Sequence, residues 1–184
     1  MNLIIPLLVI LIFIGFAYTV ISTLWTQAHG APWVPTKLRT VRRMLELADV
    51  RPGETVYDLG SGDGRVLIIA AREFGAKAVG IELDPLRVLW TRMIVFLFGL
   101  RNKVEVLTGN FFYQDLSRAD VVVCYLLTST NQRLTEKLAE ELRPGTRVVS
   151  NAFPFPDWEV VREDLEHHVY LYQIRKEDNF LDDN

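Results

Sequence analysis

Hydrophobic residues follow two different patterns along this chain of 184 residues. Residues 3–25 form one continuous apolar run without a charged side chain, and the first Asp, Glu, Lys or Arg of the sequence is Lys37. Beyond that point, apolar residues come in shorter stretches, spaced either as in an amphipathic helix or as in a buried strand. The sequence therefore predicts an apolar N-terminal helix followed by an α/β domain.

The N-terminal run is long enough to cross about 30 Å of hydrocarbon as a helix. A buried core helix would show a polar face, and a cleaved signal peptide would begin with basic residues and have a shorter apolar segment. We therefore predict an uncleaved transmembrane anchor at residues 1–28. Basic residues follow closely at Lys37, Arg39, Arg42 and Arg43. This predicts a single-pass membrane protein whose C-terminal domain lies on the cytoplasmic side, or in the matrix of an organelle.

A linker is predicted at residues 29–36, a globular domain at residues 37–176 and an acidic tail at residues 177–184. Within the domain, helical patterns alternate with near-continuous apolar strands, which is typical of a parallel sheet covered by helices on both faces. Helices are predicted at residues 37–50, 65–76, 85–100 and 131–145. Strands are predicted at residues 55–59, 77–83, 103–109, 120–127, 146–153, 158–164 and 167–176. The expected fold is a Rossmann-like, doubly wound, mostly parallel seven-stranded sheet that ends in an antiparallel hairpin.

Charge and cysteine content exclude some classes of function. The formal net charge is −3, which disfavours a general nucleic-acid-binding protein, since such a protein usually has a basic face. The single cysteine, Cys124, stands in an apolar stretch. It cannot form a disulfide framework or a Cys/His zinc site, so we expect it to be a small buried residue.

A glycine-rich turn, within the motif VYDLGSGDGRV, follows the first predicted strand. A dinucleotide-binding turn would need its third glycine at position 65, which is Arg65, and no phosphate-binding lysine follows. Two acidic residues of the turn, Asp58 and Asp63, would repel a pyrophosphate. The turn therefore favours a ligand that carries positive charge.

Two further motifs extend the predicted ligand. Glu82 ends the second strand, 22 residues after Gly60 (82 − 60), where a carboxylate can accept the hydroxyl groups of a ribose. Asn110 and Phe111 follow the third strand, where they can hydrogen-bond and flank an adenine. The predicted ligand is thus a nucleoside with a positive centre and no phosphate. S-adenosylmethionine has these features, and its ammonium group would need an acid such as Asp58.

These motifs resemble those of the seven-β-strand class I methyltransferases. The segments PWVPT, GNFFYQDLS, LLTSTNQRLTEKLAEELRPGTRVVS and FPFPDW are similar to one subgroup, the protein-lysine methyltransferases. That subgroup includes a broad-specificity archaeal enzyme and mitochondrial enzymes that act on the adenine nucleotide translocase and on the c-ring protein of ATP synthase. The mitochondrial members also carry an N-terminal membrane segment. The resemblance implies an enzyme that uses S-adenosyl-L-methionine as its cofactor and methylates a protein substrate.

The resemblance also implies roles for particular residues. Trp33 and Thr36 would close over the cofactor from the N-terminal side. The turn would contact its methionine part, Glu82 the ribose, and Asn110 with Phe111 the adenine, although many methyltransferases have Asp in place of Asn110. The predicted cofactor-binding residues are Trp33, Thr36, Asp58, Gly60, Ser61, Gly62, Asp63, Glu82, Leu83, Asn110 and Phe111.

A lysine substrate must lose a proton before it can accept a methyl group. With a pKa of about 10.4, this costs about 4.6 kcal/mol at pH 7, and a dry aromatic channel lowers the cost by desolvating the charged form. The predicted walls of this channel are Tyr125, Phe153, Phe155 and Trp158, which also offer cation–π contacts. Asn151 is predicted to orient the amine. Methyl transfer requires no metal.

Two other functions stay open on the sequence alone. A methyltransferase that acts on a lipid, a quinone or another small apolar metabolite would share the cofactor motifs, and so would a non-catalytic sensor or scaffold that binds S-adenosylmethionine. The predicted anchor would confine the protein to membrane proteins or to substrates near the membrane, and no nucleic-acid partner is expected. Residues 89–100 are apolar all round, so they either pack on the sheet or touch the membrane.

Overall fold

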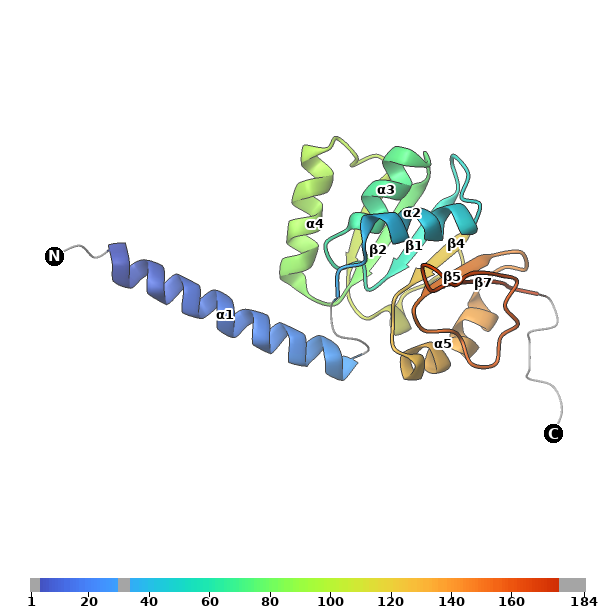
Figure 1. The fold of residues 1–184 in the computed structure, drawn as a ribbon. Helices are drawn as coiled ribbons and strands as arrows, with labels where there is room; N and C mark the ends of the chain where they lie inside the picture. The colour runs from blue at the N-terminus through green and yellow to red at the C-terminus, as the bar shows by residue number, and fades with distance from the viewer. Residues whose placement is uncertain (1–3, 30–33, 176–184) are drawn as a thin grey trace. The chain divides into compact units, whose positions relative to one another are not determined.

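The computed structural model describes the backbone of residues 4–29 and 34–175 (Figure 1). The chain divides into two compact units, Met1–Val34 and Pro35–Asn184, and each is described by itself. Trp33 and the predicted acidic tail lie outside the described residues.

The N-terminal unit contains one helix, α1 (Ile4–His29), of 26 residues. Its described apolar side chains are largely exposed, as Ile12 and Phe13 show. Among the parts of the chain that the structure describes, however, no helix is long and apolar enough to cross a membrane. The predicted transmembrane helix is therefore not found among the described residues. The predicted location of the protein is not tested by the structure.

The Pro35–Asn184 unit is built on a seven-stranded sheet with the strand order β3-β2-β1-β4-β5-β7-β6. Strands β1 to β5 are parallel, and β7 runs antiparallel to both of its neighbours. The strands are β1 (Thr55–Leu59), β2 (Lys77–Glu82), β3 (Val104–Thr108), β4 (Val121–Cys124), β5 (Arg147–Asn151), β6 (Arg162–Asp164) and β7 (Val169–Gln173). The predicted mostly parallel sheet with a C-terminal antiparallel hairpin is confirmed.

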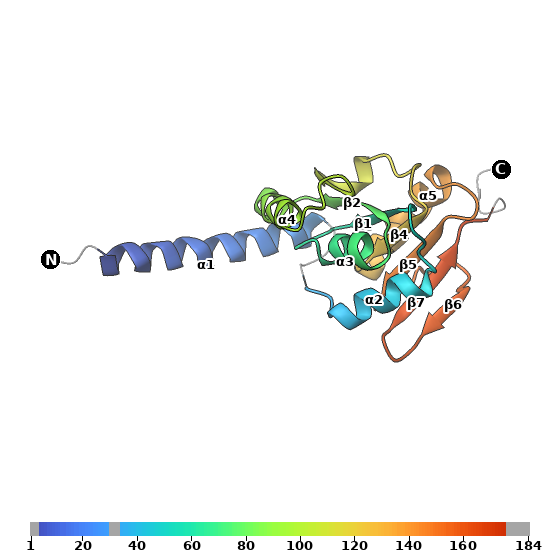
Figure 2. The same ribbon diagram turned by 90° about the horizontal axis from the view of Figure 1, so that it is seen from above.

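Helices cover both faces of the sheet, as Figure 2 shows from above. One face carries three helices, α2 (Leu38–Leu47), α3 (Arg65–Glu73) and α4 (Pro85–Leu97), and the other carries α5 (Thr128–Glu141). A short 3₁₀ helix, η1 (Phe111–Tyr113), follows β3. The arrangement is doubly wound, as the alternating pattern predicts.

Two of these helices show how the sequence sets helix ends. The Asp84 carboxylate caps α4 by accepting from the backbone N–H of Leu86 at 2.9 Å, and Pro85 then stands where a missing N–H does no harm. Helix α5 begins three residues before the predicted Asn131, because the backbone N–H groups of Thr130 and Asn131 both donate to the carbonyl of Leu127 at 2.9 Å.

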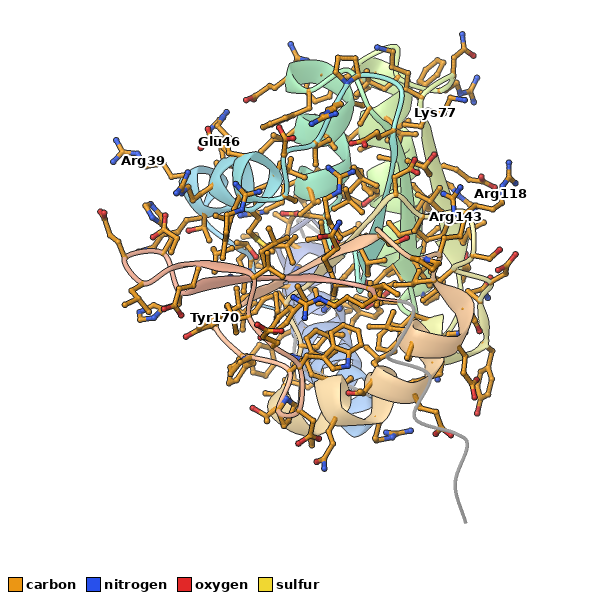
Figure 3. The ribbon with its side chains drawn as sticks, turned by 90° about the vertical axis from the view of Figure 1, so that its right-hand side faces the viewer. Arg39, Glu46, Lys77, Arg118, Arg143 and Tyr170 are labelled. Carbon is orange, nitrogen blue, oxygen red and sulfur yellow. The ribbon has the colours of Figure 1, made fainter. Side chains whose placement is uncertain are left out.

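Helix α2 shows how an amphipathic segment divides its residues between core and solvent. Val41, Met44 and Leu45 are almost fully buried and belong to the main hydrophobic core. Arg39 and Glu46 are exposed and point away from the helix into solvent (Figure 3). Since burial of one such side chain contributes roughly 1.5–3 kcal/mol, this face holds α2 on the domain.

The direction of the strands decides where a ligand can bind. In an open parallel sheet, ligands lie beyond the carboxyl ends of the strands, near the point where the strand order reverses. Here β1 lies next to both β2 and β4. Strands β2 and β3 are added on one side of β1, and β4 and β5 on the other, so the strand order reverses at β1. The glycine-rich turn follows β1 directly, and it therefore occupies that point.

Candidate active site

The glycine-rich turn is held against the end of the neighbouring strand by its own backbone. The N–H groups of Gly60 and Ser61 both donate to the carbonyl of Ile81, at 2.9 and 3.0 Å. Gly60 has a φ of +83° and Gly64 a φ of +78°, a conformation that L side chains rarely adopt. A Cβ atom at Gly64 would also lie 2.3 Å from Cγ2 of Thr91. Glycine is thus required there for both conformation and space.

Glu82 ties the turn to the start of α4. Its carboxylate accepts hydrogen bonds from the backbone N–H of Gly62, at 2.8 Å, and of Asp84, at 2.9 Å. The side chain is buried, with 5% of its surface exposed. Each carboxylate oxygen can accept more than one hydrogen bond, so Glu82 can hold two hydroxyl groups while it stays fixed. Its role toward a ribose stays a prediction.

Asp58, the fourth residue of β1, is the most perturbed acid of the site. Burial, followed by the nearby carboxylates of Glu82 and Asp63, raises its pKa from the ordinary 3.8 to about 8. A buried carboxyl group among other acids favours a cation, since a positive charge would stabilise its ionised form. The site therefore fits a ligand that brings an ammonium group.

Asp63 has a different environment from Asp58. Its carboxylate pairs with the guanidinium of Arg65, whose Nε lies 2.9 Å from Oδ1. Although burial alone would raise the pKa of Asp63, the hydrogen bond and charge of Arg65 lower it. Arg65 also donates to the carbonyl of Thr36, which brings the segment before α2 to the turn. Arg65 directly follows the glycines of the motif, but the motif alone does not predict this pairing.

The predicted adenine-binding residues form a tight turn after β3. Oδ1 of Asn110 accepts from the backbone N–H of Phe112 at 3.0 Å, which leaves its Nδ2 as the group that can face a ligand. Phe111 is 8% exposed, and its ring centroid lies 4.9 Å from that of Phe112. The N–H of Gly109 donates to the carbonyl of Glu82 at 2.9 Å. The ends of β2 and β3 are thus fixed side by side.

Ser61 and Leu83 are two predicted cofactor-binding residues whose side chains have no hydrogen-bonding role in the described site. The Oγ of Ser61 is buried and has no hydrogen-bond partner among the described atoms. A Cβ at Gly80 of β2 would lie 2.7 Å from it, so this side chain packs on the sheet. Leu83 is half-buried between Glu82 and Asp84.

The predicted aromatic channel divides into two groups in the structure. Tyr125, just after β4, stacks on Phe153, just after β5, with ring centroids 6.3 Å apart. Trp158 instead stacks on Phe155 at 4.8 Å and meets the edge of Tyr172 on β7 at 5.8 Å. Trp158 therefore belongs to a cluster that packs against β7, whereas the first pair lies at the carboxyl edge of the sheet.

A buried polar group missed by the sequence analysis holds the first aromatic pair. The carbonyl of Phe153 accepts from Nδ2 of Asn131 at 2.8 Å and from Oγ of Ser150 at 2.5 Å. Asn131 is fully buried on α5, and its Oδ1 has no partner among the described atoms. Asn151, predicted to orient an amine, is buried at the end of β5. The chain then turns at Ala152, which has a φ of +65°.

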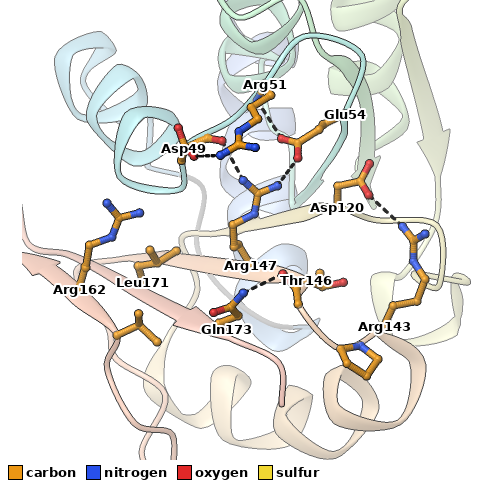
Figure 4. A pocket seen from close by; sticks show the side chains of 13 residues that line it. Asp49, Arg51, Glu54, Asp120, Arg143, Thr146, Arg147, Arg162, Leu171 and Gln173 are labelled. Atoms are coloured by element: carbon orange, nitrogen blue, oxygen red, sulfur yellow. Dashed lines mark hydrogen bonds and ion pairs between the residues drawn. The ribbon is translucent and has the colours of Figure 1, made fainter. Parts of the chain in front are cut away.

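A separate pocket of about 530 Å³ lies at the opposite edge of the sheet, where the parallel strands begin (Figure 4). Three of its four arginines are paired with acids: Arg147 with Glu54 at 2.6 Å, Arg143 with Asp120 at 2.9 Å and Arg51 with Asp49 at 2.7 Å. The fourth, Arg162, donates to the carbonyl of Leu47. Because these charges compensate each other and lie away from the turn, the pocket is not part of the candidate site. Within residues 4–29 and 34–175, no group of three or more His, Cys, Asp or Glu is placed to hold a metal ion.

Cys124 agrees with its predicted role as a buried residue. It is fully buried at the end of β4, and burial, followed by the charge of Asp58, raises the pKa of its thiol. A raised pKa keeps the thiol protonated and unreactive.

Comparison with known proteins assigns the chain to a family. The ANTKMT methyltransferase domain matches residues 58–162, more than half of the sequence. The chain belongs to the ANTKMT methyltransferase family. It is an S-adenosylmethionine-dependent methyltransferase, as the buried acids and the glycine-rich turn predict.

Relatives of this methyltransferase differ in length. A protein-lysine N-methyltransferase of Saccharolobus islandicus is 46% identical over 150 residues, covering 78% of this chain and 93% of that protein. The adenine nucleotide translocase lysine N-methyltransferase of Mus musculus is 38% identical over 71% of this chain and 56% of its own length. This chain thus spans nearly all of the first relative and little more than half of the second.

Solved structures agree with the fold of the methyltransferase. An RNA methyltransferase from Salinibacter ruber, in complex with S-adenosyl-L-homocysteine, is 49% identical, with a TM-score of 0.76. The match covers 78% of this chain and 95% of that chain. A chain of about the size of the Pro35–Asn184 unit therefore folds independently in that relative.

Proposed function

We propose that this methyltransferase methylates lysine side chains of a protein substrate. The observation that carries the proposal is the stacked pair of Tyr125 and Phe153, which lies at the same edge of the sheet as the buried acid Asp58. Support also comes from the relatives, since the Saccharolobus protein, similar over 93% of its length, is a protein-lysine N-methyltransferase.

Six of the predicted cofactor-binding residues have a proposed task that the geometry of the site supports. Asp58 binds the ammonium group, the backbone of Gly60 and Gly62 lets the methionine part approach closely, and Glu82 accepts the ribose hydroxyls. Asn110 and Phe111 bind and flank the adenine. S-adenosylmethionine supplies a methyl group on a positively charged sulfur, which is already activated for in-line transfer. The residues of the chain mainly align the reactants and exclude water.

The aromatic pair makes it easier for the substrate lysine to lose its proton. A lysine held neutral at pH 7 costs about 4.6 kcal/mol relative to the free side chain. The rings of Tyr125 and Phe153 lower this cost by keeping water from the ammonium form. After transfer, the same rings accommodate a methylated ammonium group through cation–π contacts. Asn131 and Ser150 fix the carbonyl of Phe153, so they keep this wall in place.

RNA is a second candidate substrate, because the Salinibacter relative is described as an RNA methyltransferase. The net charge of −3 argues against it, since nucleic-acid-binding surfaces are usually basic. The end of β4 also lacks the Asn/Asp-Pro-Pro-Tyr motif that accompanies methylation of base nitrogens.

An assay that offers each substrate class separately tests the proposal. The full chain is incubated with tritiated S-adenosylmethionine and, in separate tubes, with the protein fraction, the RNA and the lipid extract of the source cells. We expect label in protein that is stable to alkali and that mass spectrometry locates on lysine. Asp58→Ala and Glu82→Gln should abolish it, whereas Glu105→Gln, which removes an exposed carboxylate of β3, should not. Label only in RNA or only in lipid would overturn the proposal, and so would cofactor binding without any transfer.

A further inference from the structure

Helix α4 carries a stripe of apolar side chains on its solvent side. Six residues, spaced so that they share one face of the helix, are between 43% and 67% exposed. The α4 stripe consists of Leu86, Leu89, Trp90, Met93, Phe96 and Leu97. The opposite face of the helix supplies the buried residues Val88, Thr91 and Val95. The core of the domain is therefore complete without the stripe.

Such a surface indicates an interaction. Single exposed apolar residues are common on soluble proteins, but a contiguous patch of large ones marks a contact with a partner or a membrane. Four of the six side chains are leucine or methionine, and the other two are Trp90 and Phe96. Aromatic residues beside leucines on one helix face are typical of helices that lie in a membrane interface.

Cations stand at the carboxyl end of the stripe. The guanidinium of Arg101 lies 4.6 Å from the ring centroid of Phe96, and that of Arg72 lies 4.9 Å from the ring of Phe98. Both arginines are exposed. Of the acids nearby, Glu73 pairs with Arg42 at 2.7 Å. The arginines thus add positive charge beside the apolar side chains.

We propose that the α4 stripe rests on a lipid bilayer that contains anionic headgroups. The apolar side chains enter the boundary between headgroups and acyl chains, and Arg72 and Arg101 bind the lipid phosphates around them. The proposal fits the local charge, which is positive on a chain whose net charge is −3. Each such cation near an anionic leaflet raises the affinity for it about fivefold.

Docking through this face would bring the candidate site to the bilayer surface. Helix α4 starts directly after Glu82 and Asp84, and Glu82 holds the glycine-rich turn. The amino end of the stripe therefore lies at the carboxyl edge of the sheet. The enzyme would then meet substrates that are themselves at the membrane. The lipid contact does not depend on the proposed substrate, because it can be measured without turnover.

Vesicle binding tests the proposal. Residues 35–184, which form a compact unit of the size that folds independently in the Salinibacter relative, are sedimented with vesicles of phosphatidylcholine, with and without phosphatidylglycerol. The full chain is measured in parallel. We expect binding to the anionic vesicles, together with a shift of tryptophan emission to shorter wavelength. This unit contains only Trp90 and Trp158, so a Trp158→Phe background assigns the shift to Trp90.

Variants separate the two contributions. Replacing both Trp90 and Phe96 by Ser should weaken the partition into anionic vesicles at least tenfold, since each large apolar side chain is worth about a factor of ten when buried. Arg72→Gln with Arg101→Gln should weaken binding to anionic vesicles about tenfold or more and leave the weak binding to neutral ones unchanged. As a matched control, Tyr113→Ser with Leu165→Ser removes two apolar side chains outside α4 that are at least as exposed.

Three outcomes would overturn the proposal. The first is no binding of residues 35–184 to anionic vesicles, and the second is equal loss in the control variant. The third is a stripe variant that changes the molecular mass in sedimentation equilibrium while vesicle binding stays the same, because the stripe would then join two copies of the chain. Unchanged calorimetric binding of S-adenosylmethionine to the Ser variant shows that it is folded.

Discussion

Lowering the pH from 7 to 6 should weaken the binding of S-adenosylmethionine about tenfold, because Asp58 must give up a proton to bind the ammonium group. With a pKa of about 8 in the free protein, only about a tenth of Asp58 is ionised at pH 7 and about a hundredth at pH 6. The ammonium of the cofactor, an ordinary α-amino group with a pKa of about 7.7–8.0, stays mostly charged over this range. Affinity should therefore rise toward pH 8 and fall again above it.

The same argument predicts a proton count. Binding at pH 7 should release a net ~0.8 proton per cofactor, because about 0.9 of Asp58 is protonated beforehand while roughly 0.1 of the cofactor's amino group takes up a proton. Isothermal titration calorimetry in two buffers with different ionisation enthalpies measures this number directly. Adenosine, which lacks the ammonium group, should bind with little proton release, and Asp58→Asn should bind the cofactor weakly and without the pH dependence.

The free energy of unfolding of the cofactor-free protein should fall as the pH rises toward 8, whereas the cofactor affinity rises. An acid whose folded pKa is raised contributes stability below its unfolded pKa of about 3.8, and this contribution is lost as the pH rises through about 8. With about 1.36 kcal/mol per pKa unit, the loss reaches at most about 6 kcal/mol. Asp58→Asn should thus raise the free energy of unfolding at pH 8, as measured by urea denaturation, although it weakens cofactor binding. A variant that is no more stable at pH 8 than the wild type, together with a proton release near zero, would refute the raised pKa.

Three further changes test contacts of the site. Asn131→Asp removes the donor to the carbonyl of Phe153 and should lower kcat on a protein substrate about tenfold with little change in cofactor affinity; a loss of cofactor affinity instead would contradict a role in holding the aromatic pair. Gly64→Ala places a Cβ against Thr91 at a positive φ and should lower the free energy of unfolding by about 1–3 kcal/mol, a loss that Thr91→Ala should partly relieve in the double variant measured by urea denaturation. Arg65→Ala leaves Asp63 without its guanidinium, so calorimetry should show a cofactor affinity that depends more strongly on salt, and an unchanged salt dependence would speak against this pairing.

The parts of the site that follow from local sequence could be predicted. The glycines, Asp58 and Glu82 stand at fixed distances from strand ends, and the carboxyl ends of parallel strands must meet at one edge. The aromatic composition of its segment predicts that Trp158 lines the substrate channel. That role stays a prediction, and the contact of Trp158 with Tyr172 could not be foreseen, because Tyr172 is 14 residues away (172 − 158) and lies on a strand that pairs with β5.

Other features depend on packing that no local pattern reveals. Asn131 has the pattern of one polar residue in an amphipathic helix, but its amide reaches a carbonyl 22 residues later in the chain. The exposure of the α4 stripe is another example, because a segment that is apolar all round predicts burial equally well. Only the three buried residues on its inner face decide that the outer face remains in solvent.

The burial of Cys124 has a practical consequence for experiments in solution. It is the single cysteine of the chain, and its thiol is both inaccessible and held in the protonated form. A cysteine introduced at any exposed position would therefore be the only reactive thiol of the molecule. Substitution at Leu97, for instance, would attach one fluorescent or spin label to the end of the α4 stripe without prior removal of native cysteines. Its accessibility to a water-soluble quencher, with and without vesicles, would then report the depth of that helix end directly.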